Sequence, residues 1–206
     1  TEVAPLVERM NSKVLKGFIT SHSSGIGVMP LYQEARDLER VTVEALEKIL
    51  VLLSDIYDFI IVDAGTVVDP RSVKIFEKST AVFILTTPEV MVLNQTRKFV
   101  DQLQALHFPK EMLKVILNQY EPKGPVSMQV VNAKLARGIL TAIVKDEALV
   151  NQSVNQGQPF VLTAPRLPLS KMYADLARNL LERGVLAKLK RVVRPKDVDL
   201  GGNQGA

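Results

Sequence analysis

The sequence has no cysteine and no tryptophan, and it has two histidines, His22 and His107. Without cysteine the chain forms no disulfide, holds no metal through thiolates and has no cysteine nucleophile. Two histidines are too few for a histidine-rich metal site. Aromatic residues make up 5% of the chain, which leaves little to stack on nucleic-acid bases. The lack of cysteine also fits a reducing compartment such as the cytoplasm.

Long hydrophobic runs are missing as well. No apolar run approaches the roughly 18–20 residues that a helix needs to cross a bilayer, and the chain opens without a signal-peptide pattern. Hydrophobic residues nevertheless make up 47% of the 206 residues, so we expect one domain with a sizeable core. Because the first residue is Thr1 rather than methionine, we expect a fragment or a processed chain.

Short apolar runs alternate with stretches of helical periodicity along the chain. Strands are predicted at residues 26–30, 57–63, 81–86, 113–118 and 139–144. Helices are predicted at residues 6–19, 42–55, 70–78, 90–106, 128–137, 147–155 and 169–183, with a proline-bearing connection at 157–168. Strands separated by helices require crossover connections. The pattern therefore predicts a three-layer α/β/α domain over residues 1–183, with a mostly parallel, doubly wound sheet.

The segment YDFIIVDAG, residues 57–65, is the most informative of these runs. Its β-branched and aromatic residues predict a strand buried on both faces, as in parallel sheets. Asp63 would then lie at the carboxyl end of the strand, where open α/β sheets bind their ligands. In a phosphate-handling enzyme an aspartate there can hold Mg²⁺ through water; elsewhere it only ends the strand in a turn. On spacing alone, the turn is the favoured interpretation.

Five segments follow one another in the order of a known family. They are SHSSGIGVMPL, YDFIIVDAG, a segment beginning AVFILTTPEV, KVILNQY, and a closing segment beginning GILTAIVKDEALVNQ, over about residues 17–181. In this order the chain resembles the MinD/ParA branch of the P-loop ATPases. Within that branch it is most similar to the CpaE/TadZ-type proteins of Tad (Flp) pilus assembly. The resemblance implies a P-loop NTPase-like fold that uses ATP and Mg²⁺.

The resemblance also implies roles for three residues. Asp63 would be the Walker B acid, the catalytic and metal-binding residue that positions Mg²⁺ and the attacking water. Asn118 would contact the adenine edge, since an amide donates and accepts hydrogen bonds at once. Asp146 would line the same pocket. The residues by themselves leave alternatives open, because Asn118 is also a polar strand end and Asp146 is also a suitable helix N-cap.

The phosphate-binding loop of the family is not found in these 206 residues. No G-x-x-x-x-G-K-[ST] motif or lysine-doubled variant occurs, and the glycine-rich residues 24–27 lead into a predicted strand rather than a helix. We therefore expect the chain to lack the first strand, the P-loop and its helix, and not to hydrolyse ATP by itself. Because that strand lies centrally in the family's sheet, its absence is expected to expose strand edges and apolar surface.

Basic residues gather near the end of the chain, where no acid lies between Arg183 and Asp197. Apolar residues recur among them at helical spacing, so residues 184–206 are predicted to be a basic amphipathic segment and a flexible tail. Such a segment can lie on an anionic membrane, as MinD-type proteins do, or pack on the domain with its lysines in water. DNA binding is the least favoured of the three interpretations of this segment, because the formal net charge is only +4.

Three functions follow from these observations. The leading one is an ATP-dependent switch that places or assembles a Tad-type pilus at the cytoplasmic face of the inner membrane or at the cell pole. It would act as a homodimer or with pilus and secretion assembly proteins. The second is a non-hydrolysing scaffold of the same fold, which the missing P-loop favours. The third is a ParA-type partition ATPase, which would bind DNA in a salt-sensitive way.

Overall fold

The computed structural model describes residues 10–31 and 41–182 of the chain. The chain divides into two compact units, unit 1 (Thr1–Ser79) and unit 2 (Thr80–Ala206). The basic segment predicted at 184–206 lies outside the described residues. Within the described ranges, no helix combines the length and the apolar character that crossing a bilayer requires.

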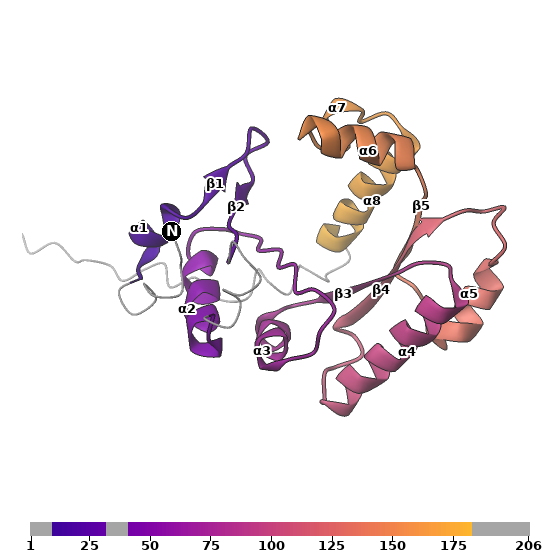
Figure 1. Ribbon diagram of the computed structural model, residues 1–206, viewed down its shortest axis with the longest axis horizontal. Helices are drawn as coiled ribbons and strands as arrows, with labels where there is room; N and C mark the ends of the chain where they lie inside the picture. Colours follow the sequence, from indigo (N-terminus) through magenta and orange to yellow (C-terminus); the bar gives the residue numbers. More distant parts are fainter. Residues whose placement is uncertain (1–9, 32–40, 183–206) are drawn as a thin grey trace, which may run out of the picture. The chain divides into compact units, whose positions relative to one another are not determined.

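Unit 1 contains helices and a small hairpin in its described residues (Figure 1). In chain order these elements are α1 (Ser12–Lys16), β1 (Thr20–Ser21), β2 (Gly27–Val28), α2 (Val43–Ser54) and α3 (Pro70–Lys78). Met10, Leu15 and Ile49 form a buried cluster that joins α1 to α2. α3 in turn packs against α2. Unit 1 thus has its own small apolar core.

The first part of unit 1 differs from the prediction. The helix predicted at 6–19 ends at Lys16, because Gly17 caps it and the chain then enters β1. β1 pairs antiparallel with β2, so the strand predicted at 26–30 is a two-residue arm of a hairpin. The prediction assumed crossover connections throughout, and local pairing across a tight turn replaced one of them here.

Side-chain caps begin the two longer helices of unit 1 at the predicted places. Thr42 Oγ1 accepts a hydrogen bond from the Ala45 N–H at 3.1 Å, which caps α2. Asp69 Oδ1 accepts from the Ser72 N–H at 2.8 Å, while the Ser72 hydroxyl accepts from the Asp69 N–H at 2.8 Å. This reciprocal pair, with Pro70 in the first turn, begins α3. The predictions of both helices are confirmed.

Residues 57–63, predicted as a buried strand, form no strand in the described part of the chain. The exposed fractions of Phe59, Ile60 and Ile61 are 56%, 37% and 97%. A strand is held in place by hydrogen bonds to its neighbours. Because none of the described strands pairs with this segment, its apolar composition does not suffice to make a strand. The prediction was wrong on both strand pairing and burial.

Unit 2 has the predicted three layers, and Figure 1 shows α4 and α5 on one face of its sheet and α6, α7 and α8 on the other. Its elements are β3 (Val82–Thr86), α4 (Val90–Ala105), β4 (Leu113–Tyr120), α5 (Met128–Leu135), β5 (Thr141–Val144), α6 (Glu147–Gln156), α7 (Phe160–Thr163) and α8 (Pro168–Glu182). The strand order is β3-β4-β5, and both pairings are parallel. The predicted α/β fold with a parallel sheet is confirmed.

Burial in unit 2 follows the position of each strand in the sheet. β3 alternates, with Val82 and Ile84 buried and Phe83 and Leu85 exposed. β4 lies between two partners and is largely buried as far as Leu117. The side chains that join the sheet to α6 and α8 are Ile116, Ile143, Leu149 and Leu169. α7 is a short helix inside the connection predicted at 157–168, and its four residues are too few for a periodic signal.

Candidate functional site

The carboxyl ends of β3, β4 and β5 lie along one edge of the sheet of unit 2, because the strands are parallel. This edge is where ligands bind in open α/β sheets. β3 ends at Thr86, β4 runs through Asn118 to Tyr120, and β5 ends at Val144. The residues at and just beyond these three ends are called the carboxyl edge below.

A buried pair of threonines fixes the end of β3. Thr86 and Thr96 are both nearly inaccessible to solvent, and their hydroxyl oxygens lie 2.8 Å apart. Thr96 Oγ1 also lies 2.9 Å from the carbonyl oxygen of Val92 in the same helix. The two hydroxyls tie β3 to α4 across the turn that joins them. The pair therefore fixes the position of the end of β3 relative to α4.

The end of β4 is irregular. Leu117 is in register with Ala142, and Tyr120 is in register with Val144, so β4 carries one extra residue between these pairs. Such a β-bulge bends a strand locally and re-aims its side chains. Gln119 lies within the bulge in the left-handed region, with φ 54°. Few residues other than glycine adopt this conformation readily.

Asn118 directly precedes the left-handed residue and is half-buried. No hydrogen bond to its side-chain amide is found among the residues that the structure describes. The amide therefore keeps a donor and an acceptor for a ligand at the carboxyl edge. The strand was predicted to end at Asn118 and continues to Tyr120, so Asn118 lies near the carboxyl end of a buried parallel strand rather than at it.

Asp146 lies just beyond β5 and begins α6. Its Oδ1 accepts a hydrogen bond from the Leu149 N–H at 3.1 Å, so Asp146 is the N-cap of that helix. Of the two roles that the residues left open, the cap is observed. The carboxylate has a second oxygen, so a ligand contact from the same position stays a prediction.

Lys145 connects the ends of β4 and β5. Its backbone N–H donates to the carbonyl oxygen of Tyr120 at 3.2 Å. Its Nζ lies 3.0 Å from Glu147 Oε1 and 3.5 Å from Glu121 Oε1. The hydrogen bond to Glu147, followed by the contact with Glu121, raises the pKa of Lys145 above its usual value. The two acids keep this cation charged and directed along the carboxyl edge.

Asp63 belongs to unit 1 and is exposed. Its Oδ1 accepts a hydrogen bond from the Gly65 N–H at 3.2 Å, and Gly65 has a φ of 67°. This is a turn closed by an aspartate side chain, which the spacing alone favoured. The expected position at the end of a buried strand is not observed, so that prediction was wrong. The role of Asp63 in binding Mg²⁺ stays a prediction.

No group of three or more histidine, cysteine or acidic side chains suited to a metal ion occurs in the described ranges 10–31 and 41–182. A single carboxylate such as Asp63 binds Mg²⁺ in combination with water and substrate phosphates. Of the three predicted site residues, Asn118 and Asp146 therefore share one sheet edge. Asp63 is the one residue of the three that is predicted to bind the metal.

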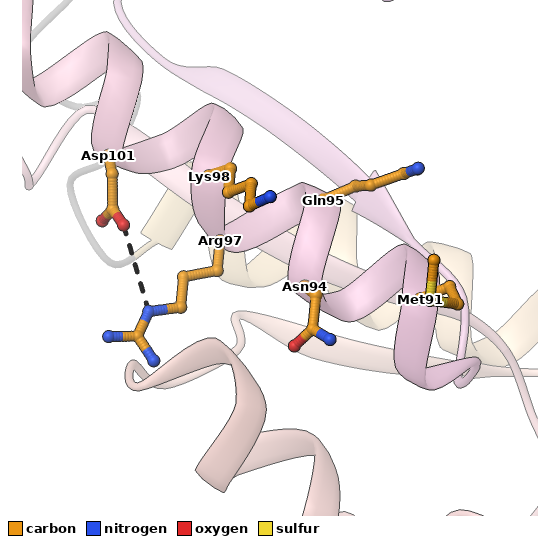
Figure 2. Close-up of a pocket in the computed structure, with 6 residues that line it drawn as sticks. All are labelled: Met91, Asn94, Gln95, Arg97, Lys98 and Asp101. Atoms are coloured by element: carbon orange, nitrogen blue, oxygen red, sulfur yellow. Dashed lines mark ion pairs between the residues drawn. The ribbon is translucent and has the colours of Figure 1, made fainter.

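A hollow on the surface of α4 lies apart from the predicted residues. It is lined by Met91, Asn94, Gln95, Arg97, Lys98 and Asp101. Figure 2 shows that all six side chains come from the one helix, with Asn94 and Arg97 on one side and Gln95 on another. Arg97 Nε lies 3.9 Å from Asp101 Oδ2, an exposed and weak ion pair. Walls from a single helix do not enclose a small molecule, so we do not place the functional site here.

Sequence reasoning missed Gln119 and Lys145. A left-handed glutamine carries no sequence signal, since asparagine or glycine is the usual choice there. Lys145 meets Glu121 because the parallel strands β4 and β5 end side by side, whereas Glu147 is only two residues away in the chain. The lysine followed by two acids in the sequence KDE at 145–147 offered the one available hint.

No protein-family model matches the chain. A curated relative, the septum site-determining protein MinD of Thermotoga maritima, is 23% identical over 189 residues. This match covers 89% of the chain and 66% of the relative, so the chain spans just under two thirds of that protein's length.

Solved structures of related proteins have the same fold. A ParA family ATPase from Chlorobium tepidum matches with a TM-score of 0.79 at 22% identity, over 86% of this chain and 74% of that one. MinD in the MinC:MinD cell division complex of Aquifex aeolicus matches with a TM-score of 0.68 at 19% identity, over 96% and 76%. The fold is therefore that of the P-loop NTPase-like α/β proteins.

Sequence and fold thus agree on one class. The chain resembles the MinD/ParA-type P-loop ATPases, as the order of its segments predicted. The similarity to CpaE/TadZ-type proteins stays a prediction, since none of these relatives is of that type.

Proposed function

We propose that the carboxyl edge of unit 2 is the base side of an adenine-nucleotide site in a MinD/ParA-type switch protein. The observation that supports this most is Asn118, whose uncommitted amide lies near the carboxyl end of the buried parallel strand β4. The amide group can donate to and accept from an adenine at once. Asp146, the cap of α6, lies just beyond the end of the neighbouring strand β5 and would border the same base.

Titration of the ¹⁵N-labelled chain with AMP tests this site directly. We expect shifts at the Asn118 side-chain amide and at the start of α6. The affinity should be weak, near 1 mM or about −4 kcal/mol, because the contacts to further phosphates are missing. Asn118→Ala should abolish the shifts, whereas Asn132→Ala, on the exposed side of α5, should leave them intact. An absence of shifts in the unmodified chain would refute the base site.

In the intact nucleotide switch, Asp63 would position Mg²⁺ and the attacking water. Its exposure leaves the carboxylate accessible, and the hydrogen bond from Gly65 leaves one oxygen for a hydrated cation. In the full-length protein, Asp63→Ala should remove nucleotide-dependent dimerisation, as measured by light scattering with ATP and Mg²⁺. Asp58→Ala, five residues earlier, is the matched control. A dimer that forms equally well in Asp63→Ala would exclude Asp63 from the switch.

The 206 residues themselves are proposed not to hydrolyse ATP, because they contain no P-loop lysine or glycine-rich phosphate cradle. Phosphate release by this chain should equal that of a blank without protein. Turnover above the blank would show that another part of the sequence binds the phosphates.

The biological role that we propose is placement or assembly of a Tad-type pilus at the inner membrane's cytoplasmic face. A second copy of the chain or pilus assembly proteins would be the partners. The support is the ordered series of segments around Asp63 and Asn118. Deletion of the gene should reduce the number of surface pili and disturb their position. Unchanged pili in the deletion strain would contradict this role.

Two other functions have observations in their favour. The missing P-loop favours a scaffold, for which pilus assembly would survive Asp63→Ala in the full-length protein. The structural similarity to a ParA family ATPase favours a partition ATPase. A partition ATPase should bind DNA at low salt and lose it steeply as salt rises. The absence of any mobility shift at low salt would dismiss it.

A further inference from the structure

The β-bulge at the end of β4 costs stability where it stands. Gln119 has a side chain but adopts the left-handed φ of 54°, which glycine would tolerate without strain. The bulge also interrupts the ladder between β4 and β5 just beyond Leu117. Strained residues that persist in a sheet tend to serve a local geometry that the site needs.

The contacts of Lys145 hold this bulge from the neighbouring strand. The Lys145 N–H donates to the Tyr120 carbonyl at 3.2 Å, immediately after the left-handed residue. Its ammonium lies between Glu121, which follows β4, and Glu147, which begins α6. Lys145 therefore contacts both the end of β4 and the start of α6.

Stability alone does not account for this arrangement. Exposed ion pairs contribute little to folding, and both acids and the lysine are well exposed. A regular strand end with glycine at the turn would be the more stable solution. What the bulge and Lys145 do determine is where the backbone of Asn118 stands at the carboxyl edge.

The placement of Asn118 matters for the choice between bases. Adenine offers a donor next to an acceptor on its pairing edge, and guanine offers the reverse order. An amide carries both a donor and an acceptor, and rotation exchanges them. A free asparagine therefore accepts either base, and discrimination requires that the backbone fix how the amide meets the bound ring.

We propose that Gln119 and Lys145 are positioning residues that set the preference of the Asn118 site for adenine over guanine. The proposal rests on the base site of the proposed function. Gln119 forms the bulge directly after Asn118, and the contacts of Lys145 tie the end of β4 to the start of α6. Neither residue needs to touch the nucleotide.

The test compares AMP with GMP by NMR titration of the ¹⁵N-labelled full 206-residue chain. We expect the unmodified chain to bind AMP about tenfold more tightly than GMP. Gln119→Val, whose branched side chain disfavours the left-handed region, and Lys145→Met, which removes both ion pairs, should bring the ratio close to one. Gln119→Gly keeps the bulge and should keep the ratio. Lys123→Met, in the loop after β4, is the control for the lost charge.

Thermal unfolding of each variant separates positioning from stability. A purely structural role would lower the melting temperature of Gln119→Val while the AMP/GMP ratio stayed near that of the unmodified chain. That result would overturn the positioning role and leave the base site standing. If the unmodified chain bound neither nucleotide, the base site and this inference would both be wrong.

Discussion

Two apolar runs of similar composition have opposite fates in this molecule. Residues 57–63 and residues 113–118 both combine β-branched residues with a polar end, and both were predicted to be buried strands. The second run is β4, where Leu117 is fully buried. The first run is irregular, and Ile61 is 97% exposed. The difference is one of neighbours, because β4 has a strand on each side.

The comparison shows what an apolar run can and cannot specify. It specifies that burial of the segment stabilises the folded state, by about 25 cal/mol for each Å² of apolar surface removed from water. It does not supply the partner whose N–H and C=O groups complete the ladder. Among the described residues of its own unit, β4 has such a partner and residues 57–63 have none. The same difference in strand pairing separates Asp63, at the end of the first run, from Asn118, at the end of the second.

Truncating the two runs should reveal the largest contrast. Leu117→Ala leaves a cavity between the sheet and its helices, and we expect it to lower the free energy of unfolding by about 2–5 kcal/mol. Ile61→Ala removes a side chain that water already surrounds, so its effect should stay within about 0.5 kcal/mol. Urea denaturation followed by circular dichroism measures both. A cost for Ile61→Ala similar to that for Leu117→Ala would mean that residues 57–63 are covered in solution.

The buried hydroxyl pair at the end of β3 should give an intermediate effect. Thr96→Val keeps the shape of the side chain but leaves the Thr86 hydroxyl without its partner at 2.8 Å. We expect a loss of about 1–3 kcal/mol in the free energy of unfolding, the cost of an unsatisfied buried group. Thr96→Ser retains the hydroxyl and should recover most of the loss. Equal stability of the valine and serine variants would show that the hydrogen bond contributes little.

The cap at Asp69 marks where the irregular stretch of unit 1 becomes a helix again. Asp69→Ala should cost about 1 kcal/mol, and Asp69→Asn, which also caps helices, should cost much less. The hydrogen bond from the Ser72 N–H, helped by Arg71, lowers the pKa of Asp69 below its ordinary value of 3.8. The stabilisation is therefore complete above pH 3.8 and is lost as the pH falls through the lowered pKa.

Asp69→Asn has no carboxyl group to titrate, so its stability should depend less on pH below 3.8 than that of the unmodified chain. Thermal unfolding over a series of acidic buffers compares the two. If their acid limbs coincide, the Asp69 cap does not contribute to acid sensitivity.

Much of the fold could be read from local signals. Helical periodicity placed α2, and Asp69 followed by Pro70 placed the start of α3, each to within a residue. The runs that became β3, β4 and β5 were placed to within two residues, and these three strands pair with one another. For the site, the order of the strands sufficed to bring Asn118 and Asp146 to one edge.

Other features had no local cause. α1 and the β1–β2 hairpin depend on where Gly17 ends a helix and on pairing across a turn. The bulge at Gln119 arises from the pairing of β4 with β5, and the sequence of neither strand indicates it. Residues 57–63 have the composition of a strand, but no described strand of unit 1 pairs with them.

The sequence by itself determined which segments favour helix or strand, where the helices begin, and that the 206 residues contain no phosphate loop. These properties depend on side chains a few residues apart. Tertiary structure alone decided which apolar run is buried, which residue takes the left-handed conformation, and that Lys145 meets Glu121 at the end of β4. Those outcomes depend on hydrogen bonds and charges between segments far apart in the chain, which a local pattern cannot encode.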